Sequence, residues 1–392
     1  MDGQDLEYAL FSHAEMARRY AAARVLMERR GIDAVLISGE ENFQYFAGTA
    51  ASLIGHYSLT RPSLFLLPMD GDPVIITQGR DNLTLGCYVT DLHDYHEVLR
   101  FPHEVVVDAL TDKGLDAARV GVELGLEQRM GLPVGGYLDL VNAMPEAEFS
   151  DAADLIIELR MVKSPEEVAY VKEAAGITDR ARQRLFNMVV PGMTERDVAR
   201  LMRQLILEEG GDRTSFVILQ LDAPGTRNQL QYERPLEAGT VLSLDAGAYY
   251  RMYTVDYARM ATLGQATEEQ KRVHRAVLDV NQRMMDALRP GVTCSELHRI
   301  TVEAIAEAGM DPDTPEKLRG SRFGHGQGML VTEPPSINPG DDTVLRPGMV
   351  ISTEPGVRSG EVQFQWEDVH VLTEDGYEQL TLETDELREI PF

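Results

Sequence analysis

Across residues 1–158, hydrophobic positions alternate between helical spacing and short apolar runs. Residues 13–30 predict a helix that ends at Gly31, because Met16, Tyr20, Ala23, Leu26 and Met27 recur on one helical face. Apolar runs bounded by turn residues predict strands at residues 34–38, 63–68, 73–77 and 119–123. The Asp70–Gly71 pair predicts a hairpin between the second and third of these strands. This part of the chain is therefore expected to form an α/β domain.

The pattern changes near residues 155–163, where an apolar stretch gives way to a helix start. Ser164 suits the N-cap, Pro165 suits the first helical position, and Glu166 and Glu167 place acids in the first turn. The sequence thus predicts two domains, residues 1–158 and residues 159–392.

The second domain contains an internal duplication. Residues 191–212 resemble residues 290–311, since both begin Pro-Gly-x-Thr, carry an acid three residues after the Thr, and end Glu-x-Gly-x-Asp. Residues 236–247 likewise resemble residues 345–356, with Asp245 aligned to Glu354. We expect an α+β domain made of two halves related by a pseudo-two-fold axis, with helices covering one face of a curved antiparallel sheet.

Composition narrows the function classes. The chain carries 37 Lys and Arg against 64 Asp and Glu, a formal charge of −27, which argues against nucleic acid as a partner. No apolar run reaches the roughly 18–20 residues that span a bilayer, and no export leader is recognisable, so no membrane partner is expected. Cys87 and Cys294 are the only cysteines, which suits a reducing cytoplasm.

Two acidic hairpins stand out within the duplicated segments. Asp245 and Asp256 flank a turn predicted near Tyr250–Arg251, which would set them opposite one another. Carboxylates so opposed, with Cβ atoms about 4.5–5.5 Å apart, repel each other and need a counter-charge.

The second copy repeats this arrangement, with Glu354 and Glu367 flanking a turn predicted near Gly360. Four carboxylates would be neutralised by two divalent cations. His325 lies between the copies in the string FGHGQG, where the glycines permit close approach to the imidazole. We therefore interpret His325 as a ligand rather than a core histidine.

The ordered set Asp245, Asp256, His325, Glu354 and Glu367 resembles the metal-ligand pattern of the pita-bread metallopeptidases, which include methionine aminopeptidase, aminopeptidase P and prolidase. The strings LSLDAG, YTVDYAR, FGHGQG, STEPGV and WEDVHVLTEDG carry this resemblance. The strings LRMVKSPEEVAYVKEAAGI and ENFQYFAGT also look like the two-domain creatinase, prolidase and aminopeptidase P branch.

This resemblance implies a hydrolase with two metal ions and a bridging hydroxide that attacks an amide or peptide carbonyl. Asp245 and Glu367 would bridge the metals, Asp256 would complete one, and His325 and Glu354 would complete the other. Glu354 would also carry a proton from the water to the leaving amine. The oxygen-rich ligand set favours Mn²⁺, with Co²⁺, Fe²⁺ or Zn²⁺ as alternatives.

The family resemblance also implies a homodimer in which the N-terminal domain closes over the neighbour's site. Tyr45 and His56 are then candidates for lining that pocket, although Tyr45 equally suits a core. Arg259 and Tyr253 are further pocket candidates near the aspartates, whereas Trp366 is expected to pack.

The pattern departs from the family at the accessory histidines that bind substrate. Thr332 and Gln231 occupy those positions, Gln365 replaces a usual Arg, and Ala258 replaces a usual Thr. Losing one transition-state donor costs about 10²–10³ in rate. Three readings therefore stay open, namely an X-Pro dipeptidase or aminopeptidase with a modified pocket, an enzyme acting on a small non-peptide compound (a C–N hydrolase or a dimethylsulfoniopropionate-type C–S lyase), and a binding module without activity.

Overall fold

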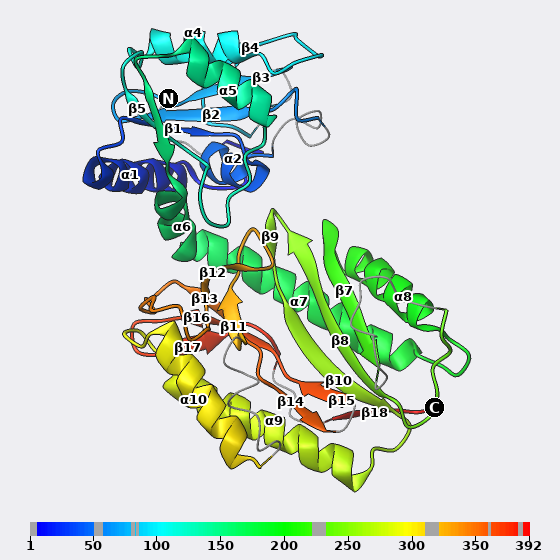
Figure 1. The fold of residues 1–392 in the computed structure, drawn as a ribbon. Helices are drawn as coiled ribbons and strands as arrows, with labels where there is room; N and C mark the ends of the chain where they lie inside the picture. The colour runs from blue at the N-terminus through cyan, green and yellow to red at the C-terminus, as the bar shows by residue number, and fades with distance from the viewer. Residues whose placement is uncertain are drawn as a thin grey trace. The chain divides into compact units, whose positions relative to one another are not determined.

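The computed structural model describes residues 6–50, 58–79, 83, 86–221, 233–309, 321–359, 362–382 and 387–392. The chain divides into two compact units, Met1–Arg160 and Met161–Phe392 (Figure 1).

The first unit is built on a six-stranded mixed sheet in the order β4-β3-β2-β1-β5-β6. Its strands are β1 (Ala34–Ile37), β2 (Leu64–Pro68), β3 (Val74–Thr77), β4 (Asp91–Asp94), β5 (Arg119–Val122) and β6 (Glu148–Asp151). Its helices are α1 (His13–Arg30), α2 (Glu40–Ala47), α4 (His103–Asp112), α5 (Val134–Ala143) and α6 (Ala153–Met161), the last reaching one residue past the unit. Helices α4 and α5 pack on one face of the sheet, and α1 and α2 lie on the other (Figure 1).

The elements expected in this unit are confirmed. Helix α1 begins after Ser12, whose side chain accepts a hydrogen bond from Glu15 N, and ends at Gly31 with φ 62°. Strands β2 and β3 form the expected antiparallel hairpin, with Gly71 at φ 91°. The α/β prediction therefore holds, because strong local signals coincide with the buried strands.

The second unit consists of two helix pairs and two sheets. The helices are α7 (Pro165–Met188), α8 (Glu195–Glu208), α9 (Glu268–Ala287) and α10 (Cys294–Glu307). The first sheet has the order β18-β10-β8-β7 with β9 paired to β8, and comprises β7 (Arg213–Leu221), β8 (Val241–Tyr250), β9 (Tyr253–Thr254), β10 (Tyr257–Leu263) and β18 (Arg388–Ile390). The second has the order β12-β11-β13-β16-β17, and comprises β11 (Gly324–Gly326), β12 (Glu333–Ser336), β13 (Val350–Thr353), β16 (Asp368–Leu372) and β17 (Tyr377–Gln379).

Each helix pair covers one of these sheets. Helices α7 and α8 share a core with β7, β8 and β10, and helices α9 and α10 share a core with β13 and neighbouring strands (Figure 1). A two-stranded ribbon, β14 (Gly356–Ser359) with β15 (Val362–Gln365), extends from the second sheet. Among the described residues of this unit, the paired strands are antiparallel except β10 with β18.

The expected duplication is visible in matching local contacts. Thr194 caps α8 and Thr293 caps α10, each accepting a hydrogen bond from the backbone N–H three residues later. Thr194 also forms an isolated bridge to Pro235, and Thr293 forms the corresponding bridge to Val344. The two halves thus repeat both their helix starts and the contacts that tie those starts to the following strand.

The expected opposition of Asp245 and Asp256 is wrong by two residues. Asp245 pairs with Ala258 across β8 and β10, and Tyr257 pairs with Ala246. The turn lies at Arg251 and Met252, both with positive φ, rather than at Tyr250–Arg251. Two positive φ values are typical of a type I′ turn, but neither residue is the usual Asn or Gly that marks one in a sequence.

The strands of the second hairpin have the expected register, while the turn predicted near Gly360 lies outside the described residues. Thr353 pairs with Asp368, and Gly356 pairs with Gln365, so Glu354 and Glu367 occupy matching positions between these pairs.

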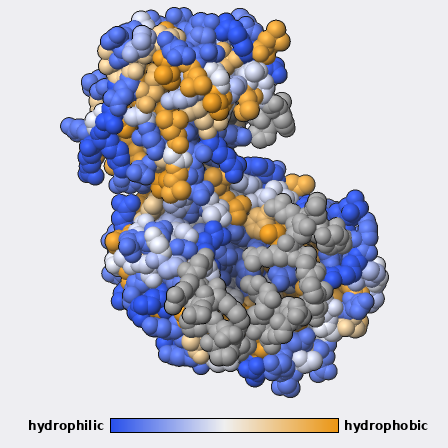
Figure 2. Space-filling view, in the orientation of Figure 1, coloured by the Kyte–Doolittle hydropathy of each residue, from blue (hydrophilic) through white to orange (hydrophobic). Residues whose placement is uncertain are grey.

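Among the described residues, no helix is long and apolar enough to cross a membrane. The visible surfaces of α8 and α10 are mainly hydrophilic (Figure 2). Both cysteines are buried and unpaired.

Candidate metal centre

Three of the five expected ligands form a compact buried cluster. One ligand atom from each of Asp256, His325 and Glu367 lies within 4.8 Å of the others. The imidazole Nε2 of His325 is 3.4 Å from Asp256 Oδ2 and 3.9 Å from Glu367 Oε1. It is also 3.8 Å from Oε1 of Glu354, so the fourth residue lies at the edge of the same cluster.

The fifth residue, Asp245, lies on β8 and is 9% exposed. It is not part of the three-residue cluster, but its charge raises the pKa of Glu367 and acts on His325. The structure therefore gathers all five predicted residues into one electrostatic environment, with Asp256, His325 and Glu367 in closest proximity.

Glycines around His325 allow the chains to approach it. A Cβ atom on Gly324 would lie 2.1 Å from the carbonyl oxygen of Ser352, and one on Gly326 would lie 2.4 Å from that of Pro334. Both distances are far below a van der Waals contact, so any larger residue would push the neighbouring strands away from the imidazole.

The tautomer of His325 is set by its own strand. Its Nδ1 lies 2.9 Å from the carbonyl oxygen of Gly326, an acceptor, so Nδ1 carries the proton and donates to it. The Nε2 lone pair then faces the carboxylates. Burial lowers the pKa of His325, although the carboxylate of Glu354 opposes this shift. A neutral imidazole with a free lone pair is the form that binds a metal.

Glu367 is the most deeply buried carboxylate of the cluster, at 1% exposure. The hydroxyl of Ser352 donates to its Oε1, whereas Oε2 has no hydrogen-bond partner among the described residues. Burial raises the pKa of Glu367 well above its usual value, and the charges of Asp256, Asp245 and Glu354 raise it further. Such crowding is unfavourable unless cations offset it. Carboxylate oxygens with one imidazole fit divalent metal ions.

Glu354 forms an ion pair with an arginine. Its side chain is 12% exposed, close to the 11% of Asp256, and Oε1 lies 3.1 Å from Nε of Arg322. Its backbone N–H donates to the carbonyl oxygen of Phe323, which fixes the main chain where β13 ends.

Arg259, a predicted pocket residue, supports the backbone beside Glu367. Its guanidinium donates to the carbonyl oxygen of Glu367 and to Oδ1 of Asp368, and it is 1% exposed. Trp366 lies over this guanidinium at 4.1 Å and donates its indole N–H to Asp368, so it packs as expected. Burial alone would raise the pKa of Asp368, but Arg259 holds it below its usual value.

Asp368 was missed by the sequence reasoning. The only available signal was its position directly after a proposed ligand, in a strand that reads as apolar.

The remaining pocket predictions have different outcomes. Tyr253 is buried, and its hydroxyl donates to Oε1 of Glu167 in the cap of α7 at 2.7 Å. Thr332 is exposed at the start of β12. Tyr45 is a core aromatic of the first unit, at 1% exposure. Gln231 and His56 lie outside the described residues.

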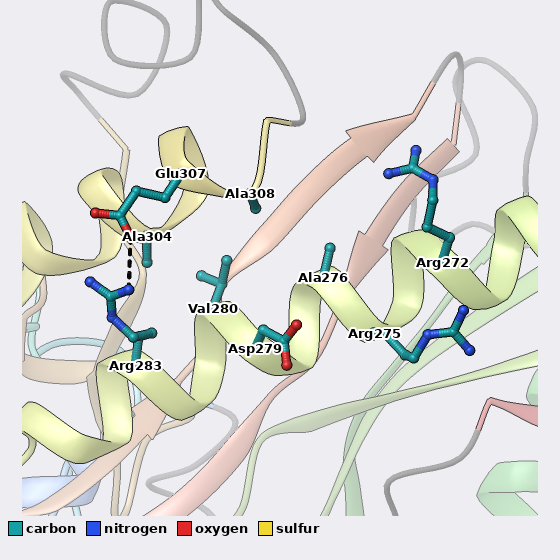
Figure 3. Close-up of a pocket in the computed structure, with 9 residues that line it drawn as sticks. All are labelled: Arg272, Arg275, Ala276, Asp279, Val280, Arg283, Ala304, Glu307 and Ala308. Carbon is teal, nitrogen blue, oxygen red and sulfur yellow. Dashed lines mark hydrogen bonds and ion pairs between the residues drawn. The ribbon is translucent and has the colours of Figure 1, made fainter.

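A separate groove of about 390 Å³ lies on the outer surface of α9 and α10 (Figure 3). Arg283 and Glu307 form an ion pair of 2.7 Å across it, and Asp279 lies on the same side of α9. None of the five candidate ligands lines this groove.

Fold and site together define a metal-dependent hydrolase of the two-domain type. The model of metallopeptidase family M24 matches residues 169–374, and that of the creatinase/prolidase N-terminal domain matches residues 19–162. The Xaa-Pro dipeptidase of Pyrococcus horikoshii is 30% identical over 366 residues, which are 91% of this chain and 94% of that protein. The chain belongs to metallopeptidase family M24 and carries the creatinase/prolidase N-terminal domain.

Solved structures agree with this assignment. The dipeptidase PepE from Mycobacterium ulcerans has a TM-score of 0.79 at 27% identity, covering 97% of this chain and all of its own length. The Xaa-Pro dipeptidase from Bacillus anthracis has a TM-score of 0.82, covers 95% of this chain and 99% of its own, and at 24% identity shows the shared fold. The predicted family, pita-bread fold class and hydrolase activity are confirmed. Membership in this family implies divalent metal ions.

Proposed function

We propose that this protein is a dipeptidase that cleaves Xaa-Pro dipeptides at a centre of two divalent metal ions. The ligands would be Asp245, Asp256, His325, Glu354 and Glu367. The observation that carries the proposal is the buried position of Glu367, whose pKa is raised by burial and by three neighbouring carboxylates. Two divalent cations would balance the four carboxylates, and the oxygen-rich set favours Mn²⁺ over Co²⁺, Fe²⁺ or Zn²⁺.

When bound, the metal ions would supply Lewis acidity and a water of lowered pKa near neutral pH. Neighbouring groups of the protein hold the proposed ligands in position. Ser352 fixes Glu367 by donating to Oε1, and the Gly326 carbonyl fixes the His325 tautomer. Among the described residues, Glu354 is the proposed ligand whose carboxylate contacts an arginine, Arg322. It would take a proton and deliver it to the leaving amine as general base and then acid.

The substrate class rests on the relatives. Several proteins similar to this chain are named Xaa-Pro dipeptidase, including the 30% identical P. horikoshii protein and a 32% identical protein from Lactobacillus delbrueckii subsp. lactis that covers 67% of this chain. We further propose the domain limits 1–158 and 159–392, a homodimer, and a cytoplasmic location in keeping with two buried, unpaired cysteines. Sedimentation of the purified protein tests the dimer.

A second candidate is action on a small non-peptide compound, by C–N hydrolysis or C–S cleavage of the dimethylsulfoniopropionate type. It is favoured by Thr332, an exposed residue without a titratable side chain where the family resemblance implies a substrate-binding histidine. In that case the metal ligands would be retained and only the substrate pocket would differ.

The test is to load metal-depleted protein with Mn²⁺, count bound metal by elemental analysis, and assay a panel of Xaa-Pro and Pro-Xaa dipeptides. The proposal expects two metal ions per chain and hydrolysis of Xaa-Pro substrates only in the loaded protein. Two bound ions with no peptide turnover would favour the second candidate. No bound metal after loading would refute both metal-dependent readings and leave the binding module.

A further inference from the structure

Three hydrogen bonds join residues 327–329 to residues 249–256, which comprise the end of β8, the turn to β9, β9 itself and the two residues after it, beside the candidate metal centre. They are Thr254 N–H to Gly328 O at 2.7 Å, the Tyr249 hydroxyl to Met329 O at 3.1 Å, and Asp256 N–H to Gln327 Oε1 at 2.7 Å. In the first two bonds the acceptor in segment 327–329 is a main-chain carbonyl, which any residue would supply. In the third the acceptor is the side chain of Gln327. This third bond holds the main chain of Asp256, a proposed ligand.

The side chain of Gln327 lies on the same face as His325. Its backbone N–H donates to the carbonyl oxygen of Val350 at 3.2 Å, which continues the pairing of β11 with β13 by one residue. Residues two apart on an extended chain share a face, so Gln327 lies beside His325, with Ser352 of β13 on the same face. Gln327 is fully buried, at 0% exposure.

One end of this amide is occupied and the other is not. Oε1 accepts the Asp256 N–H, whereas Nε2 is buried without a hydrogen-bond partner among the described residues. Reversing the amide would set its N–H₂ against the Asp256 N–H, two donors facing each other, so the bond itself fixes the orientation. A buried donor without an acceptor is unfavourable. Because Gln327 shares a face with His325 and binds the main chain of Asp256, the loaded centre would be the nearest source of that acceptor.

We propose that Gln327 is a positioning residue of the metal centre, which holds Asp256 against His325 through Oε1 and directs its amide N–H₂ at an oxygen atom that the loaded centre contains. The proposal rests on the proposed function, because it takes Asp256 and His325 as metal ligands. It gives the site a neutral hydrogen-bond donor on its buried side, whereas Thr332 is exposed.

Two variants separate the two ends of the amide. Gln327→Leu removes both, and Mn²⁺ affinity should fall about 10–100-fold, the usual cost of losing a group that orients a metal ligand. Gln327→Met keeps a weak sulfur acceptor for the Asp256 N–H, adds no charge and removes the donor. Its Mn²⁺ affinity should exceed that of Gln327→Leu by about threefold or more, while kcat for an Xaa-Pro dipeptide falls with little change in KM. Titration calorimetry with Mn²⁺ alone gives the affinities.

Gln365→Leu is the matched control. Gln365 is also buried, at 4% exposure, lies two residues from a proposed ligand, and has a buried Nε2 without a partner among the described residues. The N–H of Glu367, however, donates to the Ala258 carbonyl rather than to a glutamine side chain. The Mn²⁺ affinity of the Gln365→Leu variant should therefore stay within about twofold of that of the natural protein. Melting of each metal-free variant shows whether the fold survives.

Natural Mn²⁺ affinity in Gln327→Leu would overturn the positioning role, and natural kcat in Gln327→Met would overturn the donor role. A natural protein that binds Mn²⁺ but cleaves no dipeptide counts against the proposed substrate, while the affinities still decide the positioning role. A natural protein that binds no Mn²⁺ refutes the metal centre and this inference with it.

Discussion

His325 Nε2 lies 3.4 Å from Oδ2 of Asp256, although the two residues come from different halves of the duplicated unit. Asp256 follows β9 in the first half, and His325 belongs to β11 in the second. The centre therefore depends on the packing of the two halves, and neither half alone contains it. Metal binding and the stability of the second unit should consequently be linked, because a ligand that binds only the folded state stabilises it.

The substitution Asp245→Asn should stabilise the metal-free protein but weaken its binding of Mn²⁺. In the metal-free protein it removes one of the charges that raise the pKa of Glu367, so the melting temperature should rise. Affinity for Mn²⁺ should fall by more than about 100-fold, since the loss of an outer group alone costs 10–100-fold. Thermal melts with EDTA and with Mn²⁺ measure both effects.

Asp279→Asn is the control for this experiment, because Asp279 is an exposed aspartate on α9 away from the centre (Figure 3). It should leave both melts within about 1 °C of the natural protein, as surface substitutions usually do. Equal Mn²⁺ affinity in Asp245→Asn and the natural protein would show that Asp245 is not a ligand.

Lys163 and Glu333 form a buried ion pair, and replacing only one of the two residues should lower the stability of the protein. Their side chains are 1% and 5% exposed, with Nζ 3.2 Å from Oε2. Lys163→Met leaves the Glu333 carboxylate buried without its cation, which should lower the free energy of unfolding by about 3–5 kcal/mol. Urea unfolding measures this loss.

The double variant Lys163→Met, Glu333→Gln is the informative comparison. It removes both charges and keeps an acceptor for Leu330 N–H, which donates to Glu333 Oε1 at 3.0 Å. It should regain most of the lost stability. If the double variant were as unstable as the single one, the charge of Glu333 would not be the cause.

The sequence predicts those parts of the structure that neighbouring residues determine. Local signals suffice for the end of α1 at Gly31 and the start of α7 at Ser164, both of which were predicted and are observed. The matching positions of Glu354 and Glu367 were also predictable, because β14 and β15 pair symmetrically about the midpoint between these two residues. The register of Asp245 was not, because Arg251 and Met252 give no local sign of a turn with two positive φ values.

The surroundings of the ligands were less predictable than the ligands themselves. Arg259 could be identified as important, but its contact with the carbonyl oxygen of Glu367 joins positions 108 residues apart. Gln327 gave no signal beyond its place in FGHGQG, since its bond to Asp256 exists only once the two halves pack together. Tertiary contacts of this kind leave no local pattern in one sequence.

His370 should make the protein less stable in acid. Burial lowers its pKa to about 4 from 6.5, so between these values the unfolded chain binds a proton that the native state excludes. The stabilising contribution is complete above pH 6.5 and is lost as pH falls toward 4. A shift of this size corresponds to about 3 kcal/mol.

His370→Gln removes the titrating group while keeping a polar atom for Thr353, whose hydroxyl oxygen lies 3.2 Å from Nε2. The free energy of unfolding, measured in urea with EDTA at pH 7 and pH 4, should fall less in the variant than in the natural protein, by about 3 kcal/mol. Equal losses in both proteins would assign the acid sensitivity to other groups.

Thr332→His tests whether the substrate pocket is that of a modified peptidase. Thr332 is exposed, so the substitution needs no repacking of the core, and an imidazole would supply a donor that can also become cationic. Because one transition-state donor is worth about 10²–10³ in rate, a peptidase that lacks it should gain at least about tenfold in kcat/KM for Xaa-Pro dipeptides. Thr343→His is the control for an added histidine. Thr343 is a half-buried threonine that is not among the proposed ligands. Steady-state assays in Mn²⁺ should show the gain in Thr332→His alone, and no gain would favour a pocket built for a non-peptide substrate.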